Sequence, residues 1–293
     1  MASRMEKTRV KQRKRSQWLD VWARLRKNKV FMACLIIILI LVLSCALANV
    51  IAPYDPAQFS TGDRFESSSL QHLMGTDNYG RDLFSRVLYG GRISLLVSVL
   101  AVVIALIVGG LMGTTAGYFG GIYETIVMRI TDILMAIPSF LMALCVSVAL
   151  GTGVFKTAIA IAASAVPSYA RVTRASVLSE KNRQYVEAAS SIGTGHMKII
   201  IRHILPNILS PILVESTLRI GASIVSISGL SFIGLGVQPP TPEWGSMMSE
   251  CLTYFRDYPH LVLFPGLCIM VTIFAFNLFG DGLRDALDPR LKN

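Results

Sequence analysis

Residues 187–207, EAASSIGTGHMKIIIRHILPN, form a polar stretch within a largely apolar sequence, with two histidines, a lysine and an arginine. A metal centre or a catalytic site needs several such side chains at a spacing that brings them to one place. No C-x-x-C pattern connects the five cysteines, and the histidines are widely spread. They are His72, His196, His203 and His260. We therefore expect no catalytic residue, no metal site and no cofactor bound by this chain.

The stretch GTGVFKT at residues 151–157 partly matches the phosphate-binding loop with which many ATPases hold nucleotide. It lacks the glycine that must precede Lys156, and it falls where we expect the chain to turn on the outer side of a membrane. We predict that the chain is not an enzyme and that any energy from ATP comes from a partner.

Two pairs of charged residues stand inside apolar runs, where charge is costly and usually faces a bundle interior or a watery cavity. Glu215 and Arg219 are four residues apart, a spacing that allows an ion pair on one helix face. They either line a pathway and meet a zwitterionic solute, or form a structural ion pair; the sequence supports both equally. Arg129 and Asp132, three residues apart, fit a structural role better.

The elements that carry these residues are predicted to be transmembrane helices. Of 293 residues, 53% are hydrophobic and only 16% are charged, and the mean hydropathy is +0.55. Uncharged runs such as 31–52, 93–119 and 261–280 are each long enough to cross a bilayer as a helix, which takes about 20 residues. The fold class is therefore an all-α integral membrane protein. We expect six spans, at about 31–52, 92–118, 122–150 (kinked at Pro138), 155–177, 208–235 and 260–282.

The basic residues predict which way the chain crosses the membrane. Residues 1–30 hold eleven basic and two acidic residues, whereas the segments 53–91 and 237–259 hold four arginines between them. Basic loops stay in the cytoplasm, so both termini and the segment 178–207 are predicted to be cytoplasmic. The basic run leads straight into a membrane span, so we favour contact with lipid headgroups over nucleic-acid binding.

These predictions divide the chain into four parts. A basic cytoplasmic segment with an interfacial helix (1–30) precedes the first span and its outer loop (31–91). A transmembrane core of five spans (92–283) and a cytoplasmic tail (284–293) follow.

The segment 178–207 is predicted to form a helix–turn–helix outside the membrane. The run 185–189 has good helix formers with small side chains, and Gly193 and Gly195 allow a sharp turn. A second helix would end at Leu205-Pro206, with Asn207 as the N-cap of the next span. So rigid a connection suits docking to a cytoplasmic partner.

The order Glu187-Ala188-Ala189, then Gly193, then Leu205-Pro206 resembles the EAA motif of binding-protein-dependent ABC importer permeases. His203 stands where the general motif often has an aliphatic residue, a departure that we expect the peptide subfamily to tolerate. The resemblance extends over essentially the whole chain and is to the C-type permeases of dipeptide, oligopeptide and nickel importers. Its further stretches are GTDNYGRDLFSRVLYGGRISL (75–95), AGYFGG (116–121), GLGVQPPTPEWG (234–245) and FNLFGDGLRDALDPRL (276–291).

The resemblance implies a type I ABC importer permease fold with a cytoplasmic coupling helix, in the cell membrane of a prokaryote. Its implied partners are a B-type permease, two ATPase subunits that bind ATP and Mg, and an extracytoplasmic substrate-binding protein. The implied ATPase-coupling residues are Glu187, Ala188, Ala189, Gly193, His203, Leu205 and Pro206.

The outer segment 237–259 is stiffened by prolines, including Pro239 and Pro240, and is expected to present Glu243 and Trp244. Its predicted role is docking of the binding protein or a lid over the cavity mouth, with a tryptophan anchor at the membrane interface as the alternative. We expect di- or oligopeptides as the solute. A nickel or metal-chelate importer, or a stand-alone secondary transporter of a different class, remain the alternatives.

Overall fold

The computed structural model describes residues 22–287, and almost all of its regular structure is helical, as predicted. One isolated bridge pairs Thr76 with Asp82. The elements are α2 (Lys29–Ala46), α3 (Ala48–Ile51), α4 (Leu83–Phe119), α5 (Gly121–Ala136), α6 (Ser139–Leu150), α7 (Val154–Lys181), α8 (Gln184–Ser191), α9 (His196–Ile199), the π-helix η3 (Ile200–Ile204), α10 (Leu205–Phe232), α11 (Trp244–Cys251), the short 3₁₀-helix η4 (Leu252–Tyr254) and α12 (His260–Leu287).

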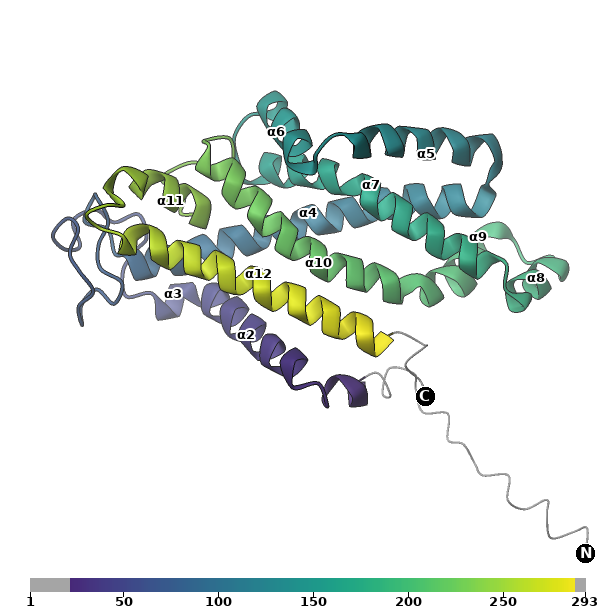
Figure 1. The fold of residues 1–293 in the computed structure, drawn as a ribbon, viewed down its shortest axis with the longest axis horizontal. Coiled ribbons are helices and arrows are strands. Elements are labelled where there is room, and N and C mark those ends of the chain that lie inside the picture. Colours follow the sequence, from purple (N-terminus) through teal and green to yellow (C-terminus); the bar gives the residue numbers. More distant parts are fainter. Residues whose placement is uncertain (1–21, 288–293) are drawn as a thin grey trace, which may run out of the picture.

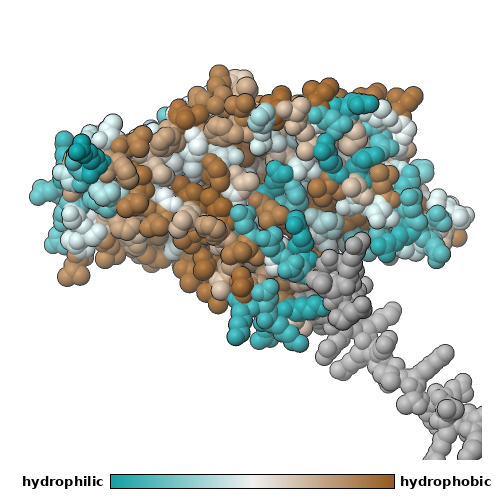
Figure 2. Space-filling view, viewed as in Figure 1, coloured by the Kyte–Doolittle hydropathy of each residue, from teal (hydrophilic) through white to brown (hydrophobic). Residues whose placement is uncertain are grey.

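The long helices α4, α7, α10 and α12 run along the long axis, with α2 beside α12 (Figure 1). The α8–α9 turn lies at one end, and α11 lies at the other with the loop that precedes α4. Hydrophobic surface covers much of the middle in Figure 2, and hydrophilic surface gathers toward the two ends. This distribution fits a helical bundle surrounded by lipid. Most of the predicted segments 1–30 and 284–293 lies outside the described residues.

Four helical segments of the described chain are long and apolar enough to cross a membrane: α2, α4, the continuous segment His196–Phe232, and α12. A fifth span results if α5 and α6, which meet at 94°, are counted together. The helix α7, predicted as the fourth span, does not pass this test, so the six-span count is not fully confirmed. Its second half carries Arg171, Arg174, Glu180 and Lys181.

Pro138 breaks the third predicted span rather than kinking it. Helix α5 ends at Ala136, Ile137 and Pro138 have extended backbone, and α6 begins at Ser139. A proline pushes the residue before it out of the helical region, which explains why Ile137 leaves the helix.

Close packing of α4 on α7 fixes the position of α7. Gly109, Gly113 and Gly117 recur every four residues and lie along one face of α4. A Cβ at Gly113 would lie 2.3 Å from the carbonyl oxygen of Ala170, and one at Gly109 would lie 2.5 Å from that of Val166. Small residues at this spacing let helix backbones approach closely in membranes. The face of α7 that carries Arg171 and Arg174 is thereby held in place.

Helix α4 starts at Leu83, nine residues before the predicted start of the span at residue 92, so residues 83–91, which we placed in the outer loop, are helical. The Asp82 carboxylate caps the new start by accepting a hydrogen bond from the Ser85 amide at 2.8 Å. Buried ion pairs make the first turns stable: Arg81 and Arg86 each donate to Glu250 of α11 at 2.9 Å. These contacts connect the loop, α4 and α11 at one end of the molecule.

Candidate functional site

Helix α8 is amphipathic, with one side buried against the bundle and the other exposed. Val186 and Ala189, three residues apart, are buried against α4, α7 and the start of α10. Glu187 and Ala188 are exposed. Of the predicted coupling residues on this helix, Glu187 and Ala188 are thus available to a partner, and Ala189 holds the helix onto the bundle.

The turn after α8 needs a glycine at position 193. Gly193 has φ +76°, a left-handed conformation that other residues adopt at a cost, and a Cβ there would touch nothing within 4 Å. The Thr194 amide donates to the Ala189 carbonyl at 3.1 Å, which closes the end of α8. Helix α9 then begins at His196.

The second helix does not stop at Leu205-Pro206, so that prediction was wrong. Helical structure continues from His196 to Phe232, and η3 replaces the expected break. Pro206 has no amide hydrogen and so cannot donate the usual helical hydrogen bond. The wider π-helical turn just before it lets the helix continue without that bond. Asn207 is not an N-cap; its Nδ2 donates to the carbonyl oxygen of His203 at 2.6 Å. Leu205 is half-buried and Pro206 exposed, both on this continuous helix.

Side chains that the sequence patterns did not indicate brace the α8–α9 turn. Tyr118 Oη, at the end of α4, lies 2.9 Å from His196 Nδ1. Lys181 Nζ, at the end of α7, donates to the Tyr118 carbonyl at 2.6 Å. No local signal reveals these contacts, because they join residues more than sixty positions apart.

A second brace centres on Tyr185, the residue before Val186 in α8. Its hydroxyl donates to Glu180 and accepts from Asn207 Nδ2 at 3.0 Å, while Arg183 Nε lies 3.0 Å from Glu180. Burial, then the hydrogen bond to Glu180, raises the pKa of Tyr185 to about 12. Tyr185 therefore stays protonated at neutral pH, and α8 is held to both α7 and α10.

Two apolar side chains stand exposed around this turn. Ile192 is 83% exposed and Met197 is 65% exposed. Large apolar groups beside hydrophilic surface often mark a place where another protein docks. Together with Glu187 and Ala188 they form the α8–α9 surface, the name used below for these four residues.

Glu215 and Arg219 form the ion pair that their spacing predicted. Arg219 Nε donates to Glu215 Oε1 at 2.7 Å, and Ser168 of α7 donates to the same oxygen at 2.9 Å. Arg219 Nη2 also lies 2.6 Å from Ser168 Oγ. The side chains are 16% and 30% exposed, respectively, for Glu215 and Arg219. The network connects α10 to α7, and both charged side chains remain partly exposed.

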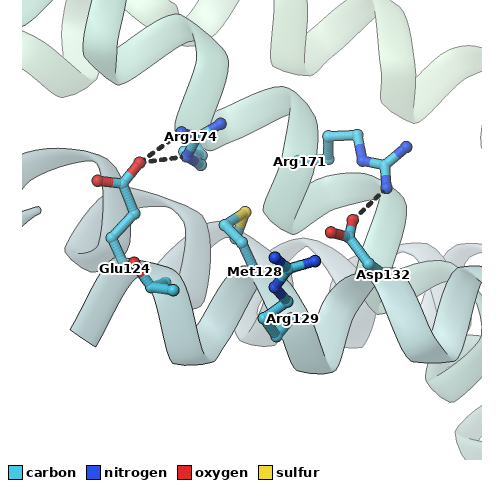
Figure 3. Close-up of a pocket in the computed structure, with 7 residues that line it drawn as sticks. Glu124, Met128, Arg129, Asp132, Arg171 and Arg174 are labelled. Atoms are coloured by element: carbon cyan, nitrogen blue, oxygen red, sulfur yellow. Dashed lines mark hydrogen bonds and ion pairs between the residues drawn. The ribbon is translucent and has the colours of Figure 1, made fainter. Parts of the chain in front are cut away.

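Arg129 and Asp132, for which we predicted a structural role, do not pair with each other. Asp132 instead accepts from Arg171 Nη2 at 2.6 Å, and Glu124 accepts from Arg174 Nε at 2.6 Å (Figure 3). Both arginines come from α7 and both carboxylates from α5, so the pairs connect these two helices. A cavity of about 480 Å³ lies between them.

The expectation that the outer segment presents Glu243 and Trp244 was wrong, since both side chains are buried. Glu243 is 0% exposed; it accepts from Ser94 Oγ at 2.9 Å and from the Ser246 amide at 3.0 Å, and so caps α11. Trp244 is 1% exposed and its Nε1 donates to the Val87 carbonyl at 2.9 Å.

Glycines of α4 explain why the indole ring is buried. A Cβ at Gly91 would lie 2.6 Å from Trp244 Cζ2, and one at Gly90 would lie 3.3 Å from Trp244 Cδ1. Their absence leaves room for the ring against α4. Pro239 and Pro240 remain exposed, so only these two of the four predicted outer residues can meet a partner directly.

Within residues 22–287, no three histidine, cysteine or acidic side chains lie close enough together to hold a metal ion. The buried cysteines Cys45 and Cys251 pack with Trp244 in one apolar cluster, which fits a structural role.

Comparisons with known proteins agree with one another. A family model described as "Binding-protein-dependent transport system inner membrane component" matches residues 105–293, and one described as "N-terminal TM domain of oligopeptide transport permease C" matches residues 16–71. Relatives named glutathione transport system permease protein GsiD, from Escherichia coli O6:K15:H31 and Shigella sonnei, are 45% identical over 279 residues, which cover 95% of this chain and 92% of theirs.

Solved structures of similar fold include an inward-facing MetNI methionine ABC transporter and an amino acid ABC transporter with histidines. The first has a TM-score of 0.56 and 16% identity, covering 69% of this chain and 97% of its own. The second has a TM-score of 0.51 and 15% identity, covering 70% and 95%. At such low identity these matches bear on the fold alone.

Proposed function

Because this chain belongs to the binding-protein-dependent transport system inner membrane components, the permeases of ABC importers, we propose that it forms half of the translocation pathway for di- or oligopeptides. As a permease it is a multi-pass membrane transport component and not an enzyme, and it acts with ATPase and permease partners. The proposed assembly is this chain, a B-type permease, two ATPase subunits that bind ATP and Mg, and a substrate-binding protein outside the cell.

The observation that carries this proposal is the α8–α9 surface at one end of the bundle. It combines two exposed apolar side chains, Ile192 and Met197, with an exposed glutamate and alanine. His196 braces the turn to the end of α4, and Tyr185 of α8 donates to Glu180 at the end of α7. A rigid element so connected can pass a movement of a docked ATPase to the bundle, because force on the turn reaches both helices.

In this proposal Glu187, Ala188 and Gly193 form the contact with the ATPase, and Ala189 anchors α8 to the bundle. His203, Leu205 and Pro206 shape the continuous helix that leads from the turn into α10. The α8–α9 end then lies in the cytoplasm with both termini, and the α11 end lies outside, where Pro239 and Pro240 would meet the binding protein. The division into residues 1–30, 31–91, 92–283 and 284–293 follows this topology.

Peptides are the proposed solute because the relatives are named glutathione permeases and the N-terminal match is to oligopeptide transport permease C. Glu215 and Arg219 are proposed to face the pathway, since each keeps an exposed fraction despite its pairing. They offer both signs of charge to a zwitterionic solute.

Purification of the native complex in mild detergent, followed by mass spectrometry and reconstitution with a labelled tripeptide, tests the proposal. We expect a second permease, two ATPases and ATP-dependent uptake. Nickel or a metal chelate in place of peptide would overturn the solute and keep the importer. Purification of the chain alone, with uptake that needs no ATPase, would instead indicate a secondary transporter.

Matched variants test the coupling surface within the same complex. Ala188→Arg places a long charged side chain on the exposed face of α8 and should abolish uptake while leaving the chain in the membrane. Ala57→Arg makes the same change at an exposed position at the α11 end and should leave ATPase coupling intact. Ala189→Arg is a poorer test, since Ala189 is buried. Full uptake by Ala188→Arg would contradict the proposed role.

A further inference from the structure

The cavity between α5 and α7 holds an unusual concentration of charge for a membrane helix pair. Five of its lining residues are charged, and the others are Thr125 and Met128. Figure 2 shows hydrophilic surface among hydrophobic surface over the region of these helices. The charged lining residues are Glu124, Arg129, Asp132, Arg171 and Arg174.

Pairing leaves one of these charges uncompensated. Arg171 is neutralised by Asp132 and Arg174 by Glu124, each through a contact of 2.6 Å. Within residues 22–287, no carboxylate lies within salt-bridge distance of Arg129. Its guanidinium lies between the two ion pairs, directed toward the cavity (Figure 3). The cavity therefore has one net positive charge, located on an exposed side chain.

The surroundings of Arg129 make an anionic partner favourable. Ile126, Ile130 and Ile133 are exposed beside Arg129 on the same half of α5, as expected of a helix that borders lipid. An isolated charge in such a segment is costly unless a counter-ion or water compensates it. An arginine binds carboxylates and other oxyanions with two parallel hydrogen bonds, and a cavity of about 480 Å³ suits a small molecule.

The cavity also lies next to the Glu215–Arg219 network. Ser168, which bonds both of those residues, and Arg171, which lines the cavity, are three residues apart on α7 and so lie on neighbouring turns. Polar groups thus follow α7 from the network to the cavity.

We propose that the α5/α7 cavity is an oxyanion subsite in which Arg129 binds the carboxylate of the transported solute. This inference rests on the proposed import of peptides. The C-terminal carboxylate is the group that all free peptides share, so a single arginine can bind peptides of different sequence. The two flanking ion pairs hold the cavity open and leave only Arg129 free to bind the solute.

The test compares a free tripeptide with its C-terminal amide in the reconstituted full complex. Triglycine and triglycinamide are measured with the wild type, Arg129→Gln and Arg129→Lys. Arg284→Gln removes the same charge from an exposed position outside this cavity and serves as the control. The ratio of variant to wild-type uptake is taken for each substrate, so that any preference of the binding protein cancels.

We expect Arg129→Gln to slow triglycine uptake about 10- to 100-fold, the loss expected for one charge-assisted contact, and to leave triglycinamide uptake unchanged. Arg129→Lys should recover part of the triglycine rate, and Arg284→Gln should match the wild type. Equal losses for both substrates, or none for either, would overturn the subsite and leave peptide import standing. A phospholipid that co-purifies with the wild type and is lost in Arg129→Gln would overturn it in favour of a lipid headgroup. If the wild type takes up neither substrate, peptide import itself fails, and the subsite fails with it.

Discussion

Truncation of Ile192 should weaken the attachment of the ATPase without disturbing the fold. Its side chain is 83% exposed, and full burial of an isoleucine side chain is worth about 1.5–3 kcal/mol. If docking covers what is now exposed, Ile192→Ala loses about 1–2 kcal/mol of binding free energy, which raises the Kd for the ATPase about 5- to 30-fold.

Leu70 provides the matched control for this experiment. It is 99% exposed and lies in the loop before α4, at the other end of the molecule from the α8–α9 surface. Leu70→Ala removes a similar apolar side chain and should leave the Kd unchanged.

The assay titrates purified ATPase subunits against the permease pair in detergent, with thermal unfolding of each variant measured in parallel. Unchanged unfolding with a raised Kd is the expected result for Ile192→Ala. A Kd within twofold of the wild type, or an equal change in Leu70→Ala, would refute the reasoning that this turn docks the ATPase.

Further predictions concern the stability of the bundle and the turn. Trp244→Ala should destabilise the chain by about 3–5 kcal/mol, since it empties a buried site against α4; an unchanged Tm in detergent would contradict that packing. Burial, followed by the nearby carboxylates of which Asp77 is the largest contributor, raises the pKa of Cys251 to about 12. Native Cys251 should therefore resist iodoacetamide at pH 8 and react after unfolding, and the free energy of unfolding should fall as pH rises from about 9 to about 12, because the unfolded thiol ionises first. Rapid alkylation of the native protein would count against this. Gly193→Ala should cost about 1–2 kcal/mol through its positive φ. Gly195→Ala, at φ −63° and also without neighbours within 4 Å, avoids that strain and should cost less; equal Tm shifts would show that backbone strain is not the cause.

Composition alone predicted the helices that consist of long uncharged runs. The uncharged runs at 31–52, 93–119 and 261–280 correspond to α2, α4 and α12, because nothing but a helix satisfies the backbone in hydrocarbon. The first turns of α4 were missed because they contain Arg86 and two glycines. Arg86 is buried and pairs with Glu250, a partner 164 residues away that no local pattern reveals.

The same limit applies to the candidate sites. Spacing predicted the Glu215–Arg219 pair correctly, since both partners lie on one helix. Spacing did not indicate the partner of Asp132, because that partner, Arg171, lies on the neighbouring helix. Local sequence also did not reveal the burial of Trp244, which depends on α4 glycines about 150 positions earlier in the chain.

The α8–α9 turn shows both outcomes within a few residues. Small residues and glycines predicted α8 and the turn at Gly193, which local conformational preferences decide. The continuation through Pro206 was not predicted, because a π-helix that absorbs a proline leaves no distinctive local pattern.

Cross-linking from the α8–α9 surface in native membranes tests most directly that this chain couples an ATPase to a permease. Ile192→Cys and Leu70→Cys are each treated with a short bifunctional maleimide, and the adducts are identified by mass spectrometry. Both positions are exposed, so both should react, and the native cysteines give the same background in each. We predict an ATPase adduct from position 192 and none from position 70. An ATPase adduct from position 70, or its absence from position 192 in an intact complex, would contradict the account.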